Sequence, residues 1–125
     1  SKNGYLNHHS YKSFFLDAEL KNKNCMYQLK YFLSIIMSVP AYFYNAMGRP
    51  LYKGNSFDAI RSEYNFDLEI LDKASLIRKL WPEKERHPYP DNKVPIWVKD
   101  ILAPAYFERA VKYVEQFVME IKRSD

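Results

Sequence analysis

The sequence is poor in glycine and cysteine, and each shortage excludes a class of structure. Glycine occurs three times and cysteine once among 125 residues. So few glycines argue against an all-β sandwich or barrel with many tight turns, and against a glycine-rich phosphate loop. The single cysteine, Cys25, excludes a disulfide framework and a cysteine-rich metal site. We therefore expect a reducing, cytoplasmic location.

Histidine is also scarce, and the three copies do not form a metal-binding pattern. His8 and His9 are adjacent, and neighbours in a helix do not face the same ligand. His87 has no histidine or cysteine at the usual ligand spacing. The sequence therefore predicts no metal and no cofactor.

Long apolar runs are limited to one segment. Residues 31–47 contain no charged residue, and a stretch of this length is just long enough to span a membrane. The stretch also includes the polar or helix-disrupting residues Ser34, Ser38, Pro40 and Asn45. The mean hydropathy of the chain is −0.48. We expect this segment to be the buried central helix of a soluble bundle without membrane contact. The first ten residues are polar, so no signal peptide is predicted.

The residues that are abundant suit a single packed domain spanning residues 1–125. Hydrophobic residues make up 47%, charged residues 27% and aromatic residues 17%, with eleven tyrosines. This content supports a core and argues against general disorder. The net charge of +4 permits contact with phosphate or an acidic partner without requiring either.

Apolar spacing predicts helices throughout the chain, and alternation typical of strands is absent. The expected helices cover residues 10–22, 24–47, about 56–64, a stretch within 67–81 that is broken near Asp72, 96–102, and a last helix opened by Pro104. Their expected first residues or caps are Ser10, Asn24, Asn55 or Ser56, and Pro95. The sequence therefore predicts an all-α bundle of five to six helices.

The helix over residues 24–47 is apolar on most of its surface, since Tyr27, Tyr31 and Ile35 extend its apolar face. Such a helix is expected in a core. Pro40 frees the carbonyl of Ile36, so a kink or break is expected there. Burying all faces of this helix within 125 residues is difficult, which predicts a homodimer or a partner chain.

Basic and aromatic side chains gather where the fourth helix meets a loop. The group consists of Arg78, Lys79, Trp81, Lys84, Arg86, His87 and Tyr89. Cations suit phosphate and aromatic rings stack on bases, so the group is a candidate site for nucleotide or RNA. The alternative is a solvated helix end with Trp81 in the core. Residues 82–95 hold four prolines, which predicts a stiff extended loop.

Two carboxylates invite comparison with a catalytic pattern. Asp67 and Glu69 follow Gly54 and Asn55 at about the spacing of polymerase-β-type nucleotidyltransferases, whose carboxylates hold Mg²⁺. Asn55 replaces the serine or glycine of that pattern, and no buried strands surround it. We interpret the match as chance.

Residues 44–53 (YNAMGRPLYK) and 56–60 (SFDAI) follow a tyrosine-rich helix. This arrangement resembles the helical domain that follows the catalytic domain in small prokaryotic nucleotidyltransferases. It is also similar to HEPN-like four-helix proteins encoded beside minimal nucleotidyltransferases. The resemblance implies a non-catalytic accessory domain that binds substrate or a catalytic partner, with Arg49 and Lys53 facing the nucleotidyltransferase cleft.

Two alternatives remain open. One is a HEPN-like ribonuclease that uses Arg78 or Arg86 with His87, although the spacing departs from the Arg-x4–6-His signature. The other is a dimeric helical interaction module without a nucleic-acid role. The predicted binding residues are Arg49, Lys53, Arg78, Trp81, Arg86, His87 and Tyr89.

Overall fold

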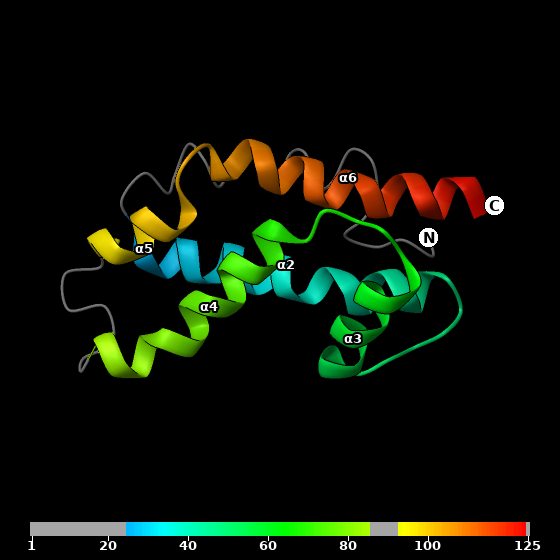
Figure 1. Cartoon of the computed structure of the whole chain (residues 1–125), viewed down its shortest axis with the longest axis horizontal. Helices are drawn as coiled ribbons and strands as arrows, with labels where there is room; N and C mark the ends of the chain where they lie inside the picture. The colour runs from blue at the N-terminus through cyan, green and yellow to red at the C-terminus, as the bar shows by residue number, and fades with distance from the viewer. Residues whose placement is uncertain (1–24, 86–92, 125) are drawn as a thin grey trace.

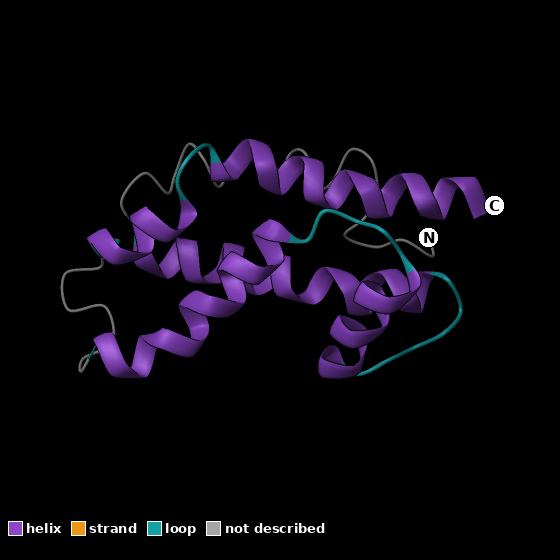
Figure 2. Ribbon diagram, viewed as in Figure 1, coloured by secondary structure: helices purple, strands orange, loops and turns teal. Residues whose placement is uncertain are grey.

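A computed structural model describes residues 25–85 and 93–124 of the chain. Five helices lie in these ranges (Figure 1): α2 (Met26–Ala46), α3 (Lys53–Glu63), α4 (Glu69–Lys84), α5 (Ile96–Leu102) and α6 (Tyr106–Ser124). The described part contains no strand (Figure 2). The predicted all-α class is confirmed. The helix expected over residues 10–22 and the Asn24 cap lie outside the described residues.

Helix α2 is the centre of the bundle, and α3, α4 and α6 all pack against it (Figure 1). Phe32, Ile36 and Phe43 are completely buried along it. Helix α6 runs beside α2 and buries the face predicted from its spacing, including Val114 and Ile121. Helices α2, α4 and α6 therefore share one core.

Helix α2 continues without interruption through Pro40, so the proline does not break it. Proline has no N–H to donate to the carbonyl of residue 36. That carbonyl, of Ile36, accepts a hydrogen bond from the hydroxyl of Tyr113 in α6 at 3.0 Å. The packing of α6 thus satisfies the group that Pro40 leaves unpaired.

Three of the four tyrosines of α2 are exposed, although the sequence predicts a helix buried on most of its surface, and only Tyr44 is buried. Tyr27 and Tyr31 are each 56% exposed, and Tyr42 is 39% exposed. A tyrosine can pack its ring while its hydroxyl stays in water, so its apolar character does not require burial. The buried face of α2 is therefore narrower than the sequence indicates.

Helix α3 begins earlier than predicted, at Lys53, with Tyr52 at the N-cap position. Ser56, an expected cap, lies inside the first turn and donates its hydroxyl to the carbonyl of Lys53 at 2.6 Å. Lys53 is consequently a helical residue and not a loop residue.

Helix α4 is unbroken at Asp72 and continues through Pro82 to Lys84, three residues into the predicted loop. A proline removes one helical hydrogen bond, and the helix resumes beyond it, since the N–H of Glu85 bonds the carbonyl of Trp81 at 2.9 Å. Leu76 is 42% exposed, because the packed face of α4 runs through Leu71, Ala74 and Ile77.

The last two helices lie close to their predicted positions. Helix α5 has the predicted bounds, with Pro95 at the N-cap and not at the first helical position. The Ala103–Pro104 bond is cis, and Ala105 has a φ of 52°. Because this φ lies outside the right-handed helical range, α6 begins after Ala105, at Tyr106, and not at Pro104.

Candidate functional site

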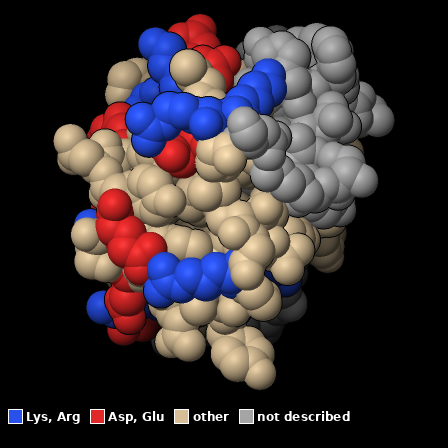
Figure 3. All heavy atoms as spheres, turned by 90° about the vertical axis from the view of Figure 1, so that its right-hand side faces the viewer, with Lys and Arg blue, Asp and Glu red and all other residues tan. Residues whose placement is uncertain are grey.

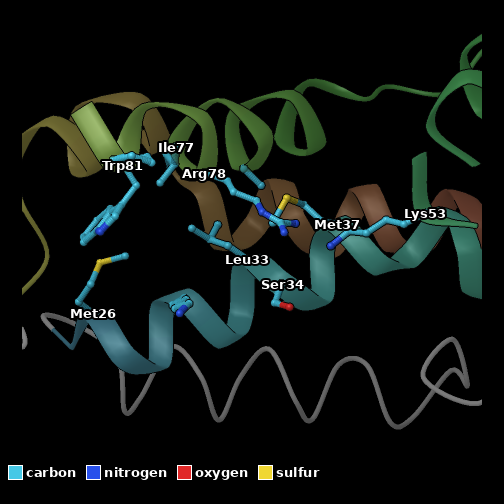
Figure 4. A pocket seen from close by; sticks show the side chains of 11 residues that line it. Met26, Leu33, Ser34, Met37, Lys53, Ile77, Arg78 and Trp81 are labelled. Carbon is cyan, nitrogen blue, oxygen red and sulfur yellow. The ribbon is translucent and has the colours of Figure 1, made fainter. Parts of the chain in front are cut away.

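A cavity of about 420 Å³ lies between α2, α3 and α4 (Figure 4). Its walls combine apolar and cationic side chains from the three helices. The lining residues are Met26, Lys30, Leu33, Ser34, Met37, Lys53, Ala74, Ile77, Arg78, Trp81 and Pro82. We call this cavity the α2–α4 pocket.

Three of the predicted binding residues meet in the α2–α4 pocket: Lys53, Arg78 and Trp81. Lys53 comes from the start of α3, while Arg78 and Trp81 lie one turn apart on α4 and so share a face. Figure 4 shows the side chains of Lys53 and Arg78 pointing toward one another, and Trp81 beside Met26 at the other end. The pocket therefore has a cationic end and an apolar end.

The charged side chains that line the α2–α4 pocket are of one sign among the described residues. They are Lys30, Lys53 and Arg78, and no acidic residue of residues 25–85 or 93–124 lines the pocket. Within residues 25–85 and 93–124, neither Lys53 nor Arg78 makes an ion pair or a side-chain hydrogen bond. The pKa of Lys53 is lowered, first by burial and then by the charge of Arg78. Both effects disfavour its charged form while no anion is present.

The position of Lys53 in α3 adds to this positive potential. The first turn of a helix carries partial positive charge, and an acidic side chain commonly offsets it. The first turn of α3 contains no acidic residue and begins with Lys53. An anion at the cationic end of the pocket would therefore meet Lys53, Arg78 and a favourable helix end together.

Arg49 does not lie in the α2–α4 pocket. Its Nη1 donates to both carboxylate oxygens of Glu63, at 2.7 and 2.8 Å, and its guanidinium lies 5.4 Å from the centre of the Tyr44 ring. Tyr44 also donates its hydroxyl to Glu63 at 3.1 Å. The hydrogen bond from Arg49 is the largest cause that holds the pKa of Glu63 below its usual range. The charge of Arg49 is thus neutralised by an internal partner.

The remaining predicted residues, Arg86, His87 and Tyr89, lie outside the described residues. Whether they approach the α2–α4 pocket stays a prediction. The same holds for the ribonuclease hypothesis, which depends on His87.

The carboxylates that resemble a catalytic pair have local partners. Asp67 accepts a hydrogen bond from the backbone N–H of Glu69 at 3.0 Å, and Glu69 pairs with Arg109 and, at 3.7 Å, with Lys73. Within the described ranges, no group of three or more histidine, cysteine or acidic side chains could hold a metal ion. The contacts of Asp67 and Glu69 suit the interpretation that the match is chance.

Other parts of the surface mix charges of both signs. A smaller hollow of about 210 Å³ between α4 and α6 contains Arg109 and Lys112 but also Asp67 and Glu69. At the end of the molecule seen in Figure 3, Lys and Arg side chains lie beside Asp and Glu. The α2–α4 pocket differs from this hollow because no acidic residue of the described ranges is part of its lining.

Sequence reasoning missed Lys30 and the methionines that line the pocket. Met26, Lys30, Leu33 and Met37 are spaced by four, three and four residues, so they share one face of α2. Lys30 is the one charged residue in α2. A single cation in an otherwise uncharged helix was the available signal.

The chain matches no family model, no curated protein and no solved structure. The resemblance to nucleotidyltransferase-associated helical proteins therefore stays a prediction. No helix in the described part is long and apolar enough to cross a membrane.

Proposed function

We propose that this chain is a non-catalytic helical binding domain whose α2–α4 pocket takes the phosphate of a nucleotide or of RNA. The observation that carries the proposal is the convergence of Lys53 and Arg78 opposite an apolar end formed by Trp81 and Met26, with no acidic side chain of the described residues in the lining. The proposed partner is a nucleotidyltransferase-type catalytic domain, and that part rests on the sequence resemblance alone.

Each end of the pocket suits one part of a nucleotide. An Arg and a Lys that converge from two helices can bind one phosphate through charge-assisted hydrogen bonds. The Trp81 ring and the Met26 and Leu33 side chains offer apolar surface to a base. A volume of about 420 Å³ lies within the range of small-molecule sites.

The proposal assigns binding and no reaction to this pocket, because its walls offer charge and apolar surface. The alternative of RNA cleavage requires His87 close to Arg78. The dimeric module without a nucleic-acid role requires that the pocket bind no phosphate at all. Both alternatives are distinguished by direct titration.

The test is a titration of ATP and of a labelled single-stranded RNA into the full chain at low salt, followed by tryptophan fluorescence and by anisotropy. Lys53→Met and Arg78→Met each remove one lining cation. Lys79→Met is the matched control, since Lys79 is exposed on α4 and does not line the pocket.

Wild type and Lys79→Met are expected to bind saturably, and each pocket variant to bind about tenfold more weakly, the loss typical of one charged hydrogen bond. The dependence of log K on log salt should become shallower by about one unit in each pocket variant. Absence of saturable binding, or equal losses in all three variants, would overturn the proposal. RNA cleavage by wild type would favour the ribonuclease alternative.

A further inference from the structure

The α2–α4 pocket places two facing cations at one end. Lys53 and Arg78 point toward one another, and neither has an acidic partner among the described residues (Figure 4). Two like charges held together in this way repel each other until an anion lies between them. The negative charge that the Lys53–Arg78 end of the pocket lacks is therefore about two units and not one.

The two kinds of nucleotide phosphate, diester and terminal monoester, differ in their negative charge. A phosphate diester inside a strand carries one negative charge, whereas a terminal monoester carries about −1.5 to −2 at pH 7, because its second pKa is near 6. A diester between Lys53 and Arg78 would leave one cation uncompensated. A monoester would neutralise both.

Resting on the function proposed above, we infer that the α2–α4 pocket selects a terminal phosphate monoester, carried by a mononucleotide or by a phosphorylated RNA end, over an internal diester. The size of the pocket also favours a single terminal nucleotide over an internal part of a strand. A cavity of about 420 Å³ suits one nucleotide unit, while grooves that follow a strand accommodate roughly 4–16 nucleotides.

The apolar end adds a second requirement. Trp81 and Met26 lie at the opposite end from the two cations, with Leu33 and Ile77 between them (Figure 4). A ligand that fills the pocket therefore joins a compact dianion to a flat apolar group. Inorganic phosphate supplies the first part only and is expected to bind at least about tenfold more weakly than 5′-AMP.

The test compares four ligands in the full chain at pH 7.5: 5′-AMP, 3′,5′-cyclic AMP, adenosine and inorganic phosphate. Cyclic AMP keeps the base and ribose of AMP but carries a diester. The expected order is AMP first, with cyclic AMP at least about tenfold weaker. In Lys53→Met and Arg78→Met this preference should largely disappear, and in Lys79→Met it should remain.

A pH series separates the charge of the ligand from that of the protein. The charged groups that line the pocket among the described residues are Lys30 of α2, Lys53 of α3 and Arg78 of α4, and all three are basic. The monoester itself is mostly a monoanion at about pH 5. AMP affinity should therefore fall toward that of cyclic AMP, whose own affinity should not fall.

Two pentanucleotides, with and without a 5′-phosphate, distinguish the two sources of the monoester. Tighter binding of the phosphorylated strand, with displacement by AMP, identifies an RNA end as a ligand. Binding of AMP without binding of either strand identifies a free mononucleotide. Equal binding of AMP and cyclic AMP, both weakened in Lys53→Met, overturns the inference and leaves the proposed function standing. Absence of binding by every ligand overturns both.

Discussion

The hydroxyl of Tyr113 in α6 donates a hydrogen bond to the carbonyl oxygen of Ile36 in α2 at 3.0 Å. Ile36 is the residue whose carbonyl would bond the N–H of residue 40 in a regular helix, and residue 40 is a proline. Tyr113 and Ile36 are both buried, so water does not replace this bond. The contact lets a proline lie in the central helix, and it attaches α6 to α2.

Replacing Tyr113 by phenylalanine should destabilise the fold by about 1–3 kcal/mol, because a buried carbonyl loses its partner while the ring is kept. In a Pro40→Ala background the same change should cost less, since an alanine at this position supplies the missing N–H. Urea unfolding, monitored by circular dichroism, gives the free energy of unfolding of wild type, of the two single variants and of the double variant. Equal costs of Tyr113→Phe in the two backgrounds would contradict this account.

The same tyrosine should make the fold sensitive to alkaline pH. Burial, and next the charge of Asp72, raise the pKa of Tyr113 well above its usual range, while Arg61 lowers it. Because the folded-state pKa exceeds the unfolded one, the stabilisation is complete below about pH 10 and is lost as the pH rises through the folded-state pKa.

The free energy of unfolding should therefore fall as the pH rises above about 10, and fall less steeply in Tyr113→Phe. Burial raises the pKa of Tyr44 above its usual range as well, so some alkaline loss remains in the variant. Identical pH profiles of the two proteins would rule out a contribution from Tyr113.

Arg49 provides a test of where the binding site ends. Its side chain is held by Glu63 and lies outside the α2–α4 pocket. Arg49→Met should therefore leave the affinity for AMP and its salt dependence near the wild-type values, while the urea midpoint falls. A loss of affinity equal to that of Arg78→Met would place Arg49 in the site.

Two glycines should respond in opposite directions to alanine. Gly48 ends α2 with a φ of 81°, a conformation that costs an L-residue about 1–2 kcal/mol. Gly54 lies inside α3, and a Cβ there would meet no atom within 4 Å. Gly48→Ala should lower the free energy of unfolding, and Gly54→Ala should raise it by up to about 1 kcal/mol. Thermal and urea unfolding of the Gly48→Ala and Gly54→Ala variants measure the two changes in the free energy of unfolding.

The sequence predicted the elements better than their ends. The apolar spacing of Val114, Val118 and Ile121 along α6, and the end of the second helix near residue 47, follow from local sequence, and the structure confirms both. The passage of α2 through Pro40 depends on Tyr113, which is 73 residues away in the sequence. A single sequence does not reveal such a partner.

The residues of the candidate site were likewise predicted only in part. Arg78 and Trp81 were predicted from a cluster of basic and aromatic residues and Lys53 from the family resemblance, and the fold brings all three into one pocket. Arg49 was also predicted from the resemblance, but Glu63, fourteen residues further along, neutralises it. Tertiary packing decides which cation is paired with an internal carboxylate and which can bind an anion. Dimer formation stays a prediction for sedimentation to test.

The central claim is that a nucleotide phosphate binds between Lys53 and Arg78. Nuclear magnetic resonance of the ¹⁵N-labelled full chain, titrated with 5′-AMP, tests it most directly. The account predicts that the largest shifts occur at the guanidinium Nε of Arg78, the backbone amide of Lys53 and the indole N–H of Trp81. The guanidinium groups of Arg49 and Arg123, which are paired with Glu63 and Glu120, should stay unchanged. Shifts centred on Arg49 or Arg123, or no shifts at saturating AMP, would contradict the account.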